Sequence, residues 1–363
     1  MLLVLATAAG VTAQAEPVRS VGADGVVTLA FTGDVLLAGS VGDAISRNGV
    51  HWPWERVREG FGAADYVVVN LETSVARSTT GIAENKQFVF RADPRTVEGL
   101  DAAGVDLVTL ANNHTLDYGR DALLETLEHL DAHGVARVGA GRNAAEAYRP
   151  VIVEFGDLRI GFIGVSRVYP FSHWAATASA PGVASGYDYA MDQVLAAVDE
   201  ALPAVDALFV LVHWGAELAD EPRAIDRSFA QALLDRGVRA VIGHHPHVLQ
   251  GFRVVEETGQ LVAWSLGNFI FRSFRDATRM SAVLYVDVAR DGRIVGARVA
   301  PMFIDDIRPR PAAERARDVL ARLRGLSAPF GTTLDETGRF SYPAFEPEPD
   351  LPPLVEVPVL QIP

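Results

Sequence analysis

The sequence predicts an α/β protein in which two sheets pack together and helices cover their outer faces. Three observations predict it: short runs that are apolar throughout, amphipathic stretches bounded by helix start and stop residues, and two hairpin patterns. The apolar runs are residues 26–31, 66–69, 105–110, 208–212, 240–242 and 261–264. Their lack of alternation indicates strands that are covered on both faces.

The predicted helices are bounded by residues that favour helix ends. The first begins with Asp93-Pro94, an N-cap followed by an N1 proline, and ends before Gly104. Three further helices are expected at 120–133, from 192 to Pro203, and at 223–236. Glycine directly after the first and last of these suits a left-handed C′ residue, and proline stops the middle one.

Two segments predict β-hairpins. Residues 151–155 and 158–164 flank Gly156-Asp157, and residues 281–289 and 294–300 flank the stronger turn signal Asp291-Gly292. Hairpins mixed with helix-flanked strands favour two packed sheets over one purely parallel sheet.

The ends of the chain differ from its middle. Residues 1–12 are apolar and precede Ala13-Gln14-Ala15, so we expect 1–15 to be a signal peptide, although no basic residue precedes the apolar run. The alternative is a frayed apolar N-terminus. The main domain is expected at 26–305, and 306–363 as an extension with a surface helix at 311–323 and a proline-rich tail. No later run is long enough for an internal membrane span. The expected signal peptide predicts an exported protein of the envelope or medium.

Composition excludes several classes of protein. The formal net charge is −14, from 32 basic and 46 acidic residues, which disfavours nucleic acid as a partner. The chain has no cysteine, which excludes disulfide scaffolds, thiolate zinc sites and iron–sulfur clusters. Of the 32 basic residues only Lys86 is a lysine.

Polar residues follow each predicted buried strand. These strand-end residues are Thr32-Gly33-Asp34, Asn70-Leu71-Glu72, Asn112-Asn113-His114, His213-Trp214-Gly215, His244-His245-Pro246-His247 and Ser265-Leu266-Gly267-Asn268. Ligands of α/β sheets bind outside the carboxyl ends of strands, so these loops are expected to converge on one pocket. Carboxylates, amides and imidazoles without thiols are typical of a divalent-metal site.

Each loop also has a simpler interpretation. Asp34 and Glu72 could cap turns, and a lone His213 at a strand end could be a hydrogen-bonded core residue. His245-Pro246-His247 is harder to explain in this way, because in an extended segment two imidazoles two residues apart point the same way.

These motifs, with Asp117-Tyr118-Gly119, together resemble the bacterial poly-gamma-glutamate capsule synthesis proteins, the CapA family. The resemblance runs in order from about residue 26 to 304. The family is similar to the calcineurin-like metallophosphoesterases, so the resemblance implies a four-layer α/β/β/α sandwich of two packed mixed sheets.

The resemblance also implies roles for individual residues. The metal ligands that it implies are Asp34, Asn113, His213, His245 and His247. Either Glu72 or Asn70 would stand at the acidic position between two metals; we assign Glu72 to the metal and Asn70 to the substrate. His114 would be the catalytic imidazole that faces the substrate, with Asp117 orienting it.

The sequence departs from the superfamily pattern at two places. Asp34 is followed by Val35-Leu36 where Asp-x-His is usual, and Asn70 stands where an aspartate is expected. A two-metal site needs charge to hold both ions, so either one or two divalent ions are expected, of Mn, Zn, Fe or Mg.

Three further residues are predicted to contact an anionic substrate. Lys86 and Arg91 resemble a family segment, and a single lysine among arginines indicates that an ammonium is needed for a carboxylate or phosphate. The alternative is a solvated hairpin. His244 adjoins the predicted ligands, and residues 166–189 form a candidate lid.

The predicted function is therefore poly-gamma-glutamate capsule synthesis or export, by hydrolysis or binding of an anionic small molecule or of the polymer itself. A capsule synthesis or export complex is the implied partner. The alternative is a secreted metal-dependent phosphoesterase without a capsule role. The sequence alone does not separate a metal-dependent hydrolase from a non-catalytic accessory protein.

Overall fold

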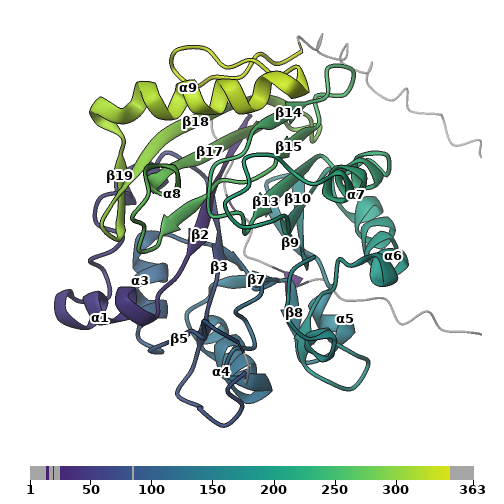
Figure 1. Ribbon diagram of the computed structural model, residues 1–363. Coiled ribbons are helices and arrows are strands. Elements are labelled where there is room, and N and C mark those ends of the chain that lie inside the picture. The colour runs from purple at the N-terminus through teal and green to yellow at the C-terminus, as the bar shows by residue number, and fades with distance from the viewer. Residues whose placement is uncertain (1–13, 16–18, 20–24, 84–85, 344–363) are drawn as a thin grey trace, which may run out of the picture.

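The computed structural model describes residues 14–15, 19, 25–83 and 86–343. Its strands form two large sheets, one of seven strands and one of eight, that pack face to face (Figure 1). The predicted signal peptide lies outside the described residues except for residues 14–15, and the proline-rich tail beyond residue 343 also lies outside them. No helix in the described part of the chain is long and apolar enough to cross a membrane.

The seven-stranded sheet has the order β1-β9-β10-β12-β13-β15-β14. The bounds of its strands are β1 Gln14–Ala15, β9 Val151–Phe155, β10 Leu158–Ser166, β12 Ala207–His213, β13 Ala240–His244, β15 Leu261–Ala263 and β14 Phe252–Val254. Strands β10, β12, β13 and β15 are parallel, so their carboxyl ends lie at one edge.

The eight-stranded sheet has the order β19-β18-β17-β2-β3-β6-β7, with β16 also paired to β2. The bounds are β19 Arg308–Pro311, β18 Ile294–Asp305, β17 Met280–Val288, β2 Val27–Val35, β3 Tyr66–Leu71, β6 Leu107–Thr109, β7 Ala136–Val138 and β16 Asn268–Ile270. Strands β2, β3, β6 and β7 are parallel. Two small sheets pair β4 Ser74–Val75 with β5 Arg91–Ala92, and β8 Ala140–Gly141 with β11 Gly182–Val183.

Both predicted hairpins are confirmed, since β9 pairs antiparallel with β10 and β17 pairs antiparallel with β18. The core between the two sheets contains alternate residues of the strands, such as Val27, Leu29 and Phe31 of β2. Phe31 stacks on Phe209 of the other sheet with ring centroids 5.6 Å apart. The two sheets therefore share one continuous apolar core.

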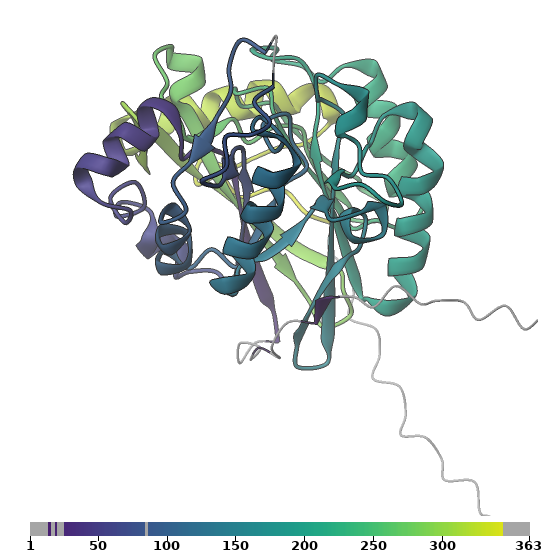
Figure 2. The same ribbon diagram turned by 90° about the horizontal axis from the view of Figure 1, so that it is seen from below.

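Helices cover both outer faces. The bounds of the helices are α1 Gly39–Asn48, α2 Arg58–Phe61, α3 Thr96–Ala103, α4 Gly119–Ala132, α5 Ala144–Ala147, α6 Met191–Ala201, α7 Ala224–Leu234, α8 Asp276–Arg279 and α9 Ala316–Ser327. α1, α3 and α4 pack on one sheet, and α6 and α7 pack on the other. Figure 2 shows these purple-to-blue and teal-to-green helices on opposite sides of the strands. The predicted four-layer α/β/β/α sandwich is confirmed.

The region after residue 305 packs with the main domain. β19 extends the eight-stranded sheet, and α9 lies across β18 and β14 (Figure 1). Val319 and Leu323 of α9 join the core between the sheets. The helix begins at Ala316, five residues after the predicted start at 311, because Pro311 ends β19 and a short 3-10 turn, Ala313–Arg315, follows.

Candidate metal centre

The predicted site residues lie at or just beyond the carboxyl ends of parallel strands. Asp34 is near the end of β2, Glu72 follows β3, and His213 is the last residue of β12. The close approach of two strands requires a glycine beside Asp34. A Cβ atom on Gly33 would lie 2.0 Å from the carbonyl oxygen of Gly267, the same oxygen that accepts the Asp34 backbone N–H at 2.9 Å.

A chain of side-chain amides fixes the position of Asp34. Asn70 Nδ2 donates to Asp34 Oδ1 at 2.8 Å, and Asn70 Oδ1 accepts from Asn112 at 3.1 Å. Asn112 Oδ1 in turn accepts the backbone N–H of His114 at 3.0 Å. Asn70 therefore uses both ends of its amide within the protein. This arrangement argues against Asn70 as a direct contact of the substrate.

The donor atoms of the predicted ligands lie close together. Ligand atoms of Glu72, His245 and His247 all lie within 4.8 Å of one another. His213 Nε2 lies 2.8 Å from Asn113 Oδ1 and 3.5 Å from Glu72 Oε1. Such separations are short enough for neighbouring atoms to share one ion.

The remaining ligand pairs connect this group to Asp34. His247 Nδ1 lies 3.2 Å from Asp34 Oδ2, and His247 Nε2 lies 3.9 Å from Glu72 Oε1. The structure thus brings all six side chains that were assigned to the metal into one cluster.

Burial and neighbouring charge shift the pKa values of these groups in different directions. Burial and the charge of Asp34 raise the pKa of Glu72 well above its usual value. Burial raises the pKa of Asp34 as well, but the hydrogen bond and charge of His247 outweigh it, so this pKa is lowered. Burial and the charge of His247 lower the pKa of His245 to about 3. Burial lowers the pKa of His247, but Glu72 and Asp34 raise it to about 10.

Three buried atoms of the cluster have no hydrogen-bond partner among the described residues. These atoms are Glu72 Oε1, Glu72 Oε2 and His245 Nδ1. A buried carboxylate without a donor is costly, and natural proteins rarely leave such a group unpaired. A divalent cation would bind both the carboxylate oxygens and the imidazole nitrogen, so the residues present fit a bound metal ion.

The backbone around the His-x-His pair differs from the expected extended conformation. His245 has φ +98° and His247 has φ +58°, a region that non-glycine residues rarely adopt. The two rings nevertheless lie together, with centroids 5.7 Å apart. Strained conformations of this kind cluster at functional sites, because the surrounding structure holds them in place.

Asn268 is a contact that the sequence did not predict. Its Oδ1 lies 2.9 Å from His247 Nδ1, while its Nδ2 donates to Ser273 and to the carbonyl of Thr278. The contact at Nδ1 leaves His247 Nε2 available to a ligand, which is the usual arrangement of a metal-binding histidine. The signal was the Gly267-Asn268 pair after a buried strand, which had been noted without a role.

His114, Asp117 and Lys86 form a second group beside the ligands. His114 Nδ1 lies 2.6 Å from Asp117 Oδ2 and 2.8 Å from Lys86 Nζ. Burial lowers the pKa of His114, and the charge of His114 in turn affects the pKa values of His213 and His245. His114 thus lies with its Nδ1 against Asp117, next in the chain to Asn113, whose Oδ1 contacts His213.

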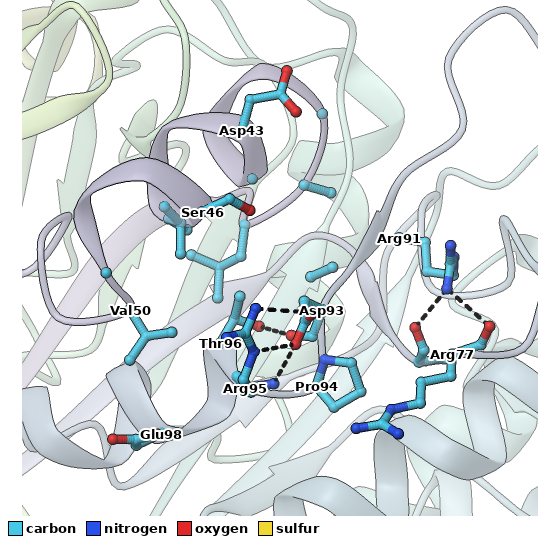
Figure 3. A pocket seen from close by; sticks show the side chains of 18 of the residues that line it. Asp43, Ser46, Val50, Arg77, Arg91, Asp93, Pro94, Arg95, Thr96 and Glu98 are labelled. Atoms are coloured by element: carbon cyan, nitrogen blue, oxygen red, sulfur yellow. Dashed lines mark hydrogen bonds and ion pairs between the residues drawn. The ribbon is translucent and has the colours of Figure 1, made fainter.

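Two of the predicted substrate contacts point elsewhere. Arg91 donates to the carbonyls of Ala76 and Arg77, both at 2.9 Å, and lines a separate cavity of about 600 Å³ beside α1 (Figure 3). His244 is buried, and its Nε2 lies 3.0 Å from the carbonyl of Thr32. Both side chains thus contact backbone carbonyls, and direct contact of either with the substrate stays a prediction.

The chain is similar to proteins of bacterial capsule synthesis. The family profile described as "Bacterial capsule synthesis protein PGA_cap" matches residues 28–273. The "Capsule biosynthesis protein CapA" of Bacillus anthracis is 28% identical over 294 residues, which cover 78% of this chain and 69% of that protein. The "PGA biosynthesis protein CapA" of Bacillus subtilis is 28% identical over 290 residues, covering 79% and 74%. A "Probable polyglutamine synthesis accessory protein" of Mycobacterium tuberculosis is 28% identical over 302 residues, covering 77% of each chain.

Solved structures give weaker similarities. A phosphatase of Mycoplasma pneumoniae aligns with a TM-score of 0.49 and 14% identity, covering 77% of this chain and 95% of that one. A 5'-nucleotidase precursor of Thermus thermophilus aligns with a TM-score of 0.47 and 18% identity, covering 77% and 54%. Both scores are below 0.5, so the chemistry of the site is argued from its own residues.

Proposed function

The chain belongs to the bacterial capsule synthesis protein family PGA_cap, and from this premise we propose that it is an exported, metal-dependent hydrolase that acts in poly-γ-glutamate synthesis or export. Its substrate would be an anionic small molecule or the polymer itself, handled within a capsule synthesis or export complex. The names of the Bacillus relatives support the biosynthetic part of this proposal. The site residues support the hydrolytic part.

One observation carries the proposal: Glu72 is buried, and neither of its carboxylate oxygens accepts a hydrogen bond from the described residues, while His213, His245 and His247 surround it. These four side chains, with Asp34 and Asn113, would hold the ion. A bound divalent ion would polarise a phosphoryl or amide oxygen of the substrate and make water a better nucleophile near neutral pH.

The protein's own residues would supply the proton transfer. Asp117 accepts a hydrogen bond from His114 Nδ1 and fixes the orientation of the ring. His114 Nε2 is then the ring nitrogen left for the substrate, where it would donate a proton to the leaving group. This division of roles is that of a general acid and the carboxylate that orients it.

The ligand set favours a single ion over a pair. Asn70 uses its Nδ2 on Asp34 and its Oδ1 on Asn112, so it is not free to bind a second ion. Leu36 stands at the position where the superfamily has a further histidine. The loss of these two ligands also supports a second candidate function: an accessory protein that binds anions without hydrolysing them.

The test is metal reconstitution followed by assay. The purified chain is loaded in turn with Mn²⁺, Zn²⁺, Fe²⁺ and Mg²⁺ and tested on a chromogenic phosphoester and on poly-γ-glutamate. We expect turnover with at least one metal, and a loss of about 10²- to 10⁴-fold in His114→Ala, which should keep its metal. His133→Ala, an exposed histidine at the end of α4, serves as the matched control and should keep full activity.

The outcomes separate the candidate functions. Stoichiometric metal without turnover on either substrate would overturn the hydrolase and support the accessory protein. Turnover of the phosphoester alone, without any effect on the polymer, would support the secreted phosphoesterase without a capsule role.

A further inference from the structure

Lys86 is the lone lysine of the chain, and its ammonium lies against Asn113, His114 and Asp117. Nζ donates to the backbone carbonyl of Asn113 at 2.5 Å and forms an ion pair with Asp117 Oδ1. It also lies 2.8 Å from His114 Nδ1, the ring nitrogen that donates to Asp117 Oδ2. Two of the three N–H donors of the ammonium are therefore used within the protein.

The segment that carries Lys86 is anchored on the same aspartate. The backbone N–H of Phe90 donates to Asp117 Oδ2 at 2.7 Å, and the backbone N–H of Ala83 donates to the Asp117 carbonyl at 2.8 Å. The Phe90 ring packs on the His114 ring with centroids 4.6 Å apart. Residues on both sides of Lys86 therefore hold the His114–Asp117 pair as well.

The candidate lid covers this contact. Lys86 Nζ lies 5.5 Å from the ring centroid of Trp174, a buried residue of the 166–189 segment. The Lys86 side chain is 11% exposed and the Asp117 side chain is fully buried. Asp117 is thus a buried carboxylate whose counter-charge is supplied from a loop outside the two large sheets.

The geometry also explains why this position is a lysine in an arginine-rich chain. The Asn113 carbonyl and Asp117 Oδ1 converge on one point beside the His114 ring, which suits the compact ammonium with its rotatable donors. A guanidinium is planar and larger, with donors spread in a fork that fits bidentate acceptors better than a single point.

We infer that Lys86 is a positioning residue, which acts through His114 by binding Asn113, His114 and Asp117 into one rigid unit. One end of this unit, Asn113 Oδ1, faces His213 among the metal ligands. The other end, the His114 ring, faces the substrate. This inference rests on the proposed role of His114 and replaces the expectation that Lys86 binds the substrate directly.

The first test is a double-mutant cycle on hydrolysis of the chromogenic phosphoester by the metal-loaded full chain. Lys86→Met should lower kcat by about 10- to 100-fold, as is typical when a supporting partner is lost, and leave KM within about twofold. In the His114→Ala background the same substitution should change kcat by less than about twofold, because a residue that acts through another has no separate effect. Losses that multiply, or a rise in KM with unchanged kcat, would show direct substrate contact and overturn the inference.

Gln87→Met is the matched control, since Gln87 is an exposed neighbour on the same segment and receives the same side chain. It should leave kcat and KM unchanged. If Lys86→Met does not fold, Lys86→Arg, which keeps the charge, enters the same cycle with the same criterion of non-additivity.

The second test does not depend on turnover. In ¹⁵N-histidine-labelled, chelator-treated full chain, the ring-nitrogen signals of His114, assigned from His114→Ala, should shift in Lys86→Met and stay in place in Gln87→Met. Unchanged signals in Lys86→Met would overturn the inference. A wild-type chain that hydrolyses nothing with any metal would refute the proposed hydrolase, while this measurement would still decide whether Lys86 holds His114.

Discussion

The buried Glu72 and the half-buried Glu146 have opposite surroundings. Both carboxylate oxygens of Glu146 accept hydrogen bonds, from the Arg142 backbone N–H at 2.9 Å and the Arg142 guanidinium at 2.8 Å, and Arg137 adds an ion pair at 3.0 Å. Arg137 also holds Asp131 through two bonds of 3.1 Å. Glu72 has no such donors among the described residues and lies among carboxylate and imidazole groups instead.

The comparison shows how a structural cluster differs from a binding cluster. In the Arg137 network each charge has its partner within the fold, so the network contributes to stability and needs nothing further. In the Glu72 cluster the polar atoms converge without satisfying one another, which is unfavourable until a cation binds. The first cluster should respond to mutation with a loss of stability, and the second with a loss of binding.

The largest effect is expected at the metal ligands. His245→Ala removes one of the three side chains whose ligand atoms lie within 4.8 Å of one another, and it should weaken divalent-metal binding by about 100-fold or more. Isothermal titration with Zn²⁺ or Mn²⁺ measures it. Arg137→Met should bind metal as the wild type does, and an equal loss of affinity in both variants would break the distinction between the two clusters.

The next largest effect is expected on stability. Arg137→Met leaves Asp131 and Glu146 without their shared guanidinium, and the Arg137 side chain is only 4% exposed. Loss of one partner from a buried ion pair should lower the free energy of unfolding by about 3 kcal/mol. Urea denaturation followed by circular dichroism measures this change, and a change below about 0.5 kcal/mol would contradict a structural role.

A smaller effect is expected from pH. Burial raises the pKa of Glu146, but the Arg142 N–H and the charge of Arg137 outweigh it, so the folded-state pKa is lowered. A lowered carboxyl pKa contributes stability above the unfolded-state pKa, and this contribution is lost as the pH falls through the folded-state value. Wild type should therefore exceed Glu146→Gln by about 1 kcal/mol at neutral pH, and the difference should vanish under acid conditions. A difference that grows on acidification would contradict this sign.

The smallest effect is expected for Glu72→Gln in the chelator-treated protein. The substitution removes a buried carboxylate that accepts no hydrogen bond from the described residues, so the free energy of unfolding should stay within about 1 kcal/mol or rise. Chemical denaturation of both metal-free chains measures the change. A loss of several kcal/mol would show that Glu72 belongs to a structural network like that of Glu146.

Much of the fold followed from the sequence because local patterns carry it. Runs such as 208–212 are apolar on both faces, and the structure places this run within β12, between the shared core and the α6–α7 layer. Gly104, Gly134 and Gly237 have positive φ at the ends of the predicted helices. Strand β7 had not been predicted, because its three residues have Arg137 at their centre and show no apolar run.

The sequence predicted which residues form the candidate site better than it predicted their backbone conformations and contacts. Residue type and position after a strand predicted a divalent-metal site, because parallel strands bring their carboxyl ends together, and the family resemblance named the individual ligands. The positive φ values of His245 and His247 have no local signal, since neither residue is a glycine or asparagine. Lys86 contacts residues that lie 27 to 31 positions away in the chain, and the loop that carries it has no periodic pattern. Its partners could therefore be identified only from the structure.

The central claim is that one divalent cation is bound among Glu72, His245 and His247. Anomalous diffraction from crystals of the full chain grown with Mn²⁺ or Zn²⁺ tests it most directly. We predict a strong anomalous peak in contact with these three side chains, and its absence in crystals of His245→Ala. A well-ordered wild-type site without a peak, or a peak only elsewhere on the molecule, would contradict the claim.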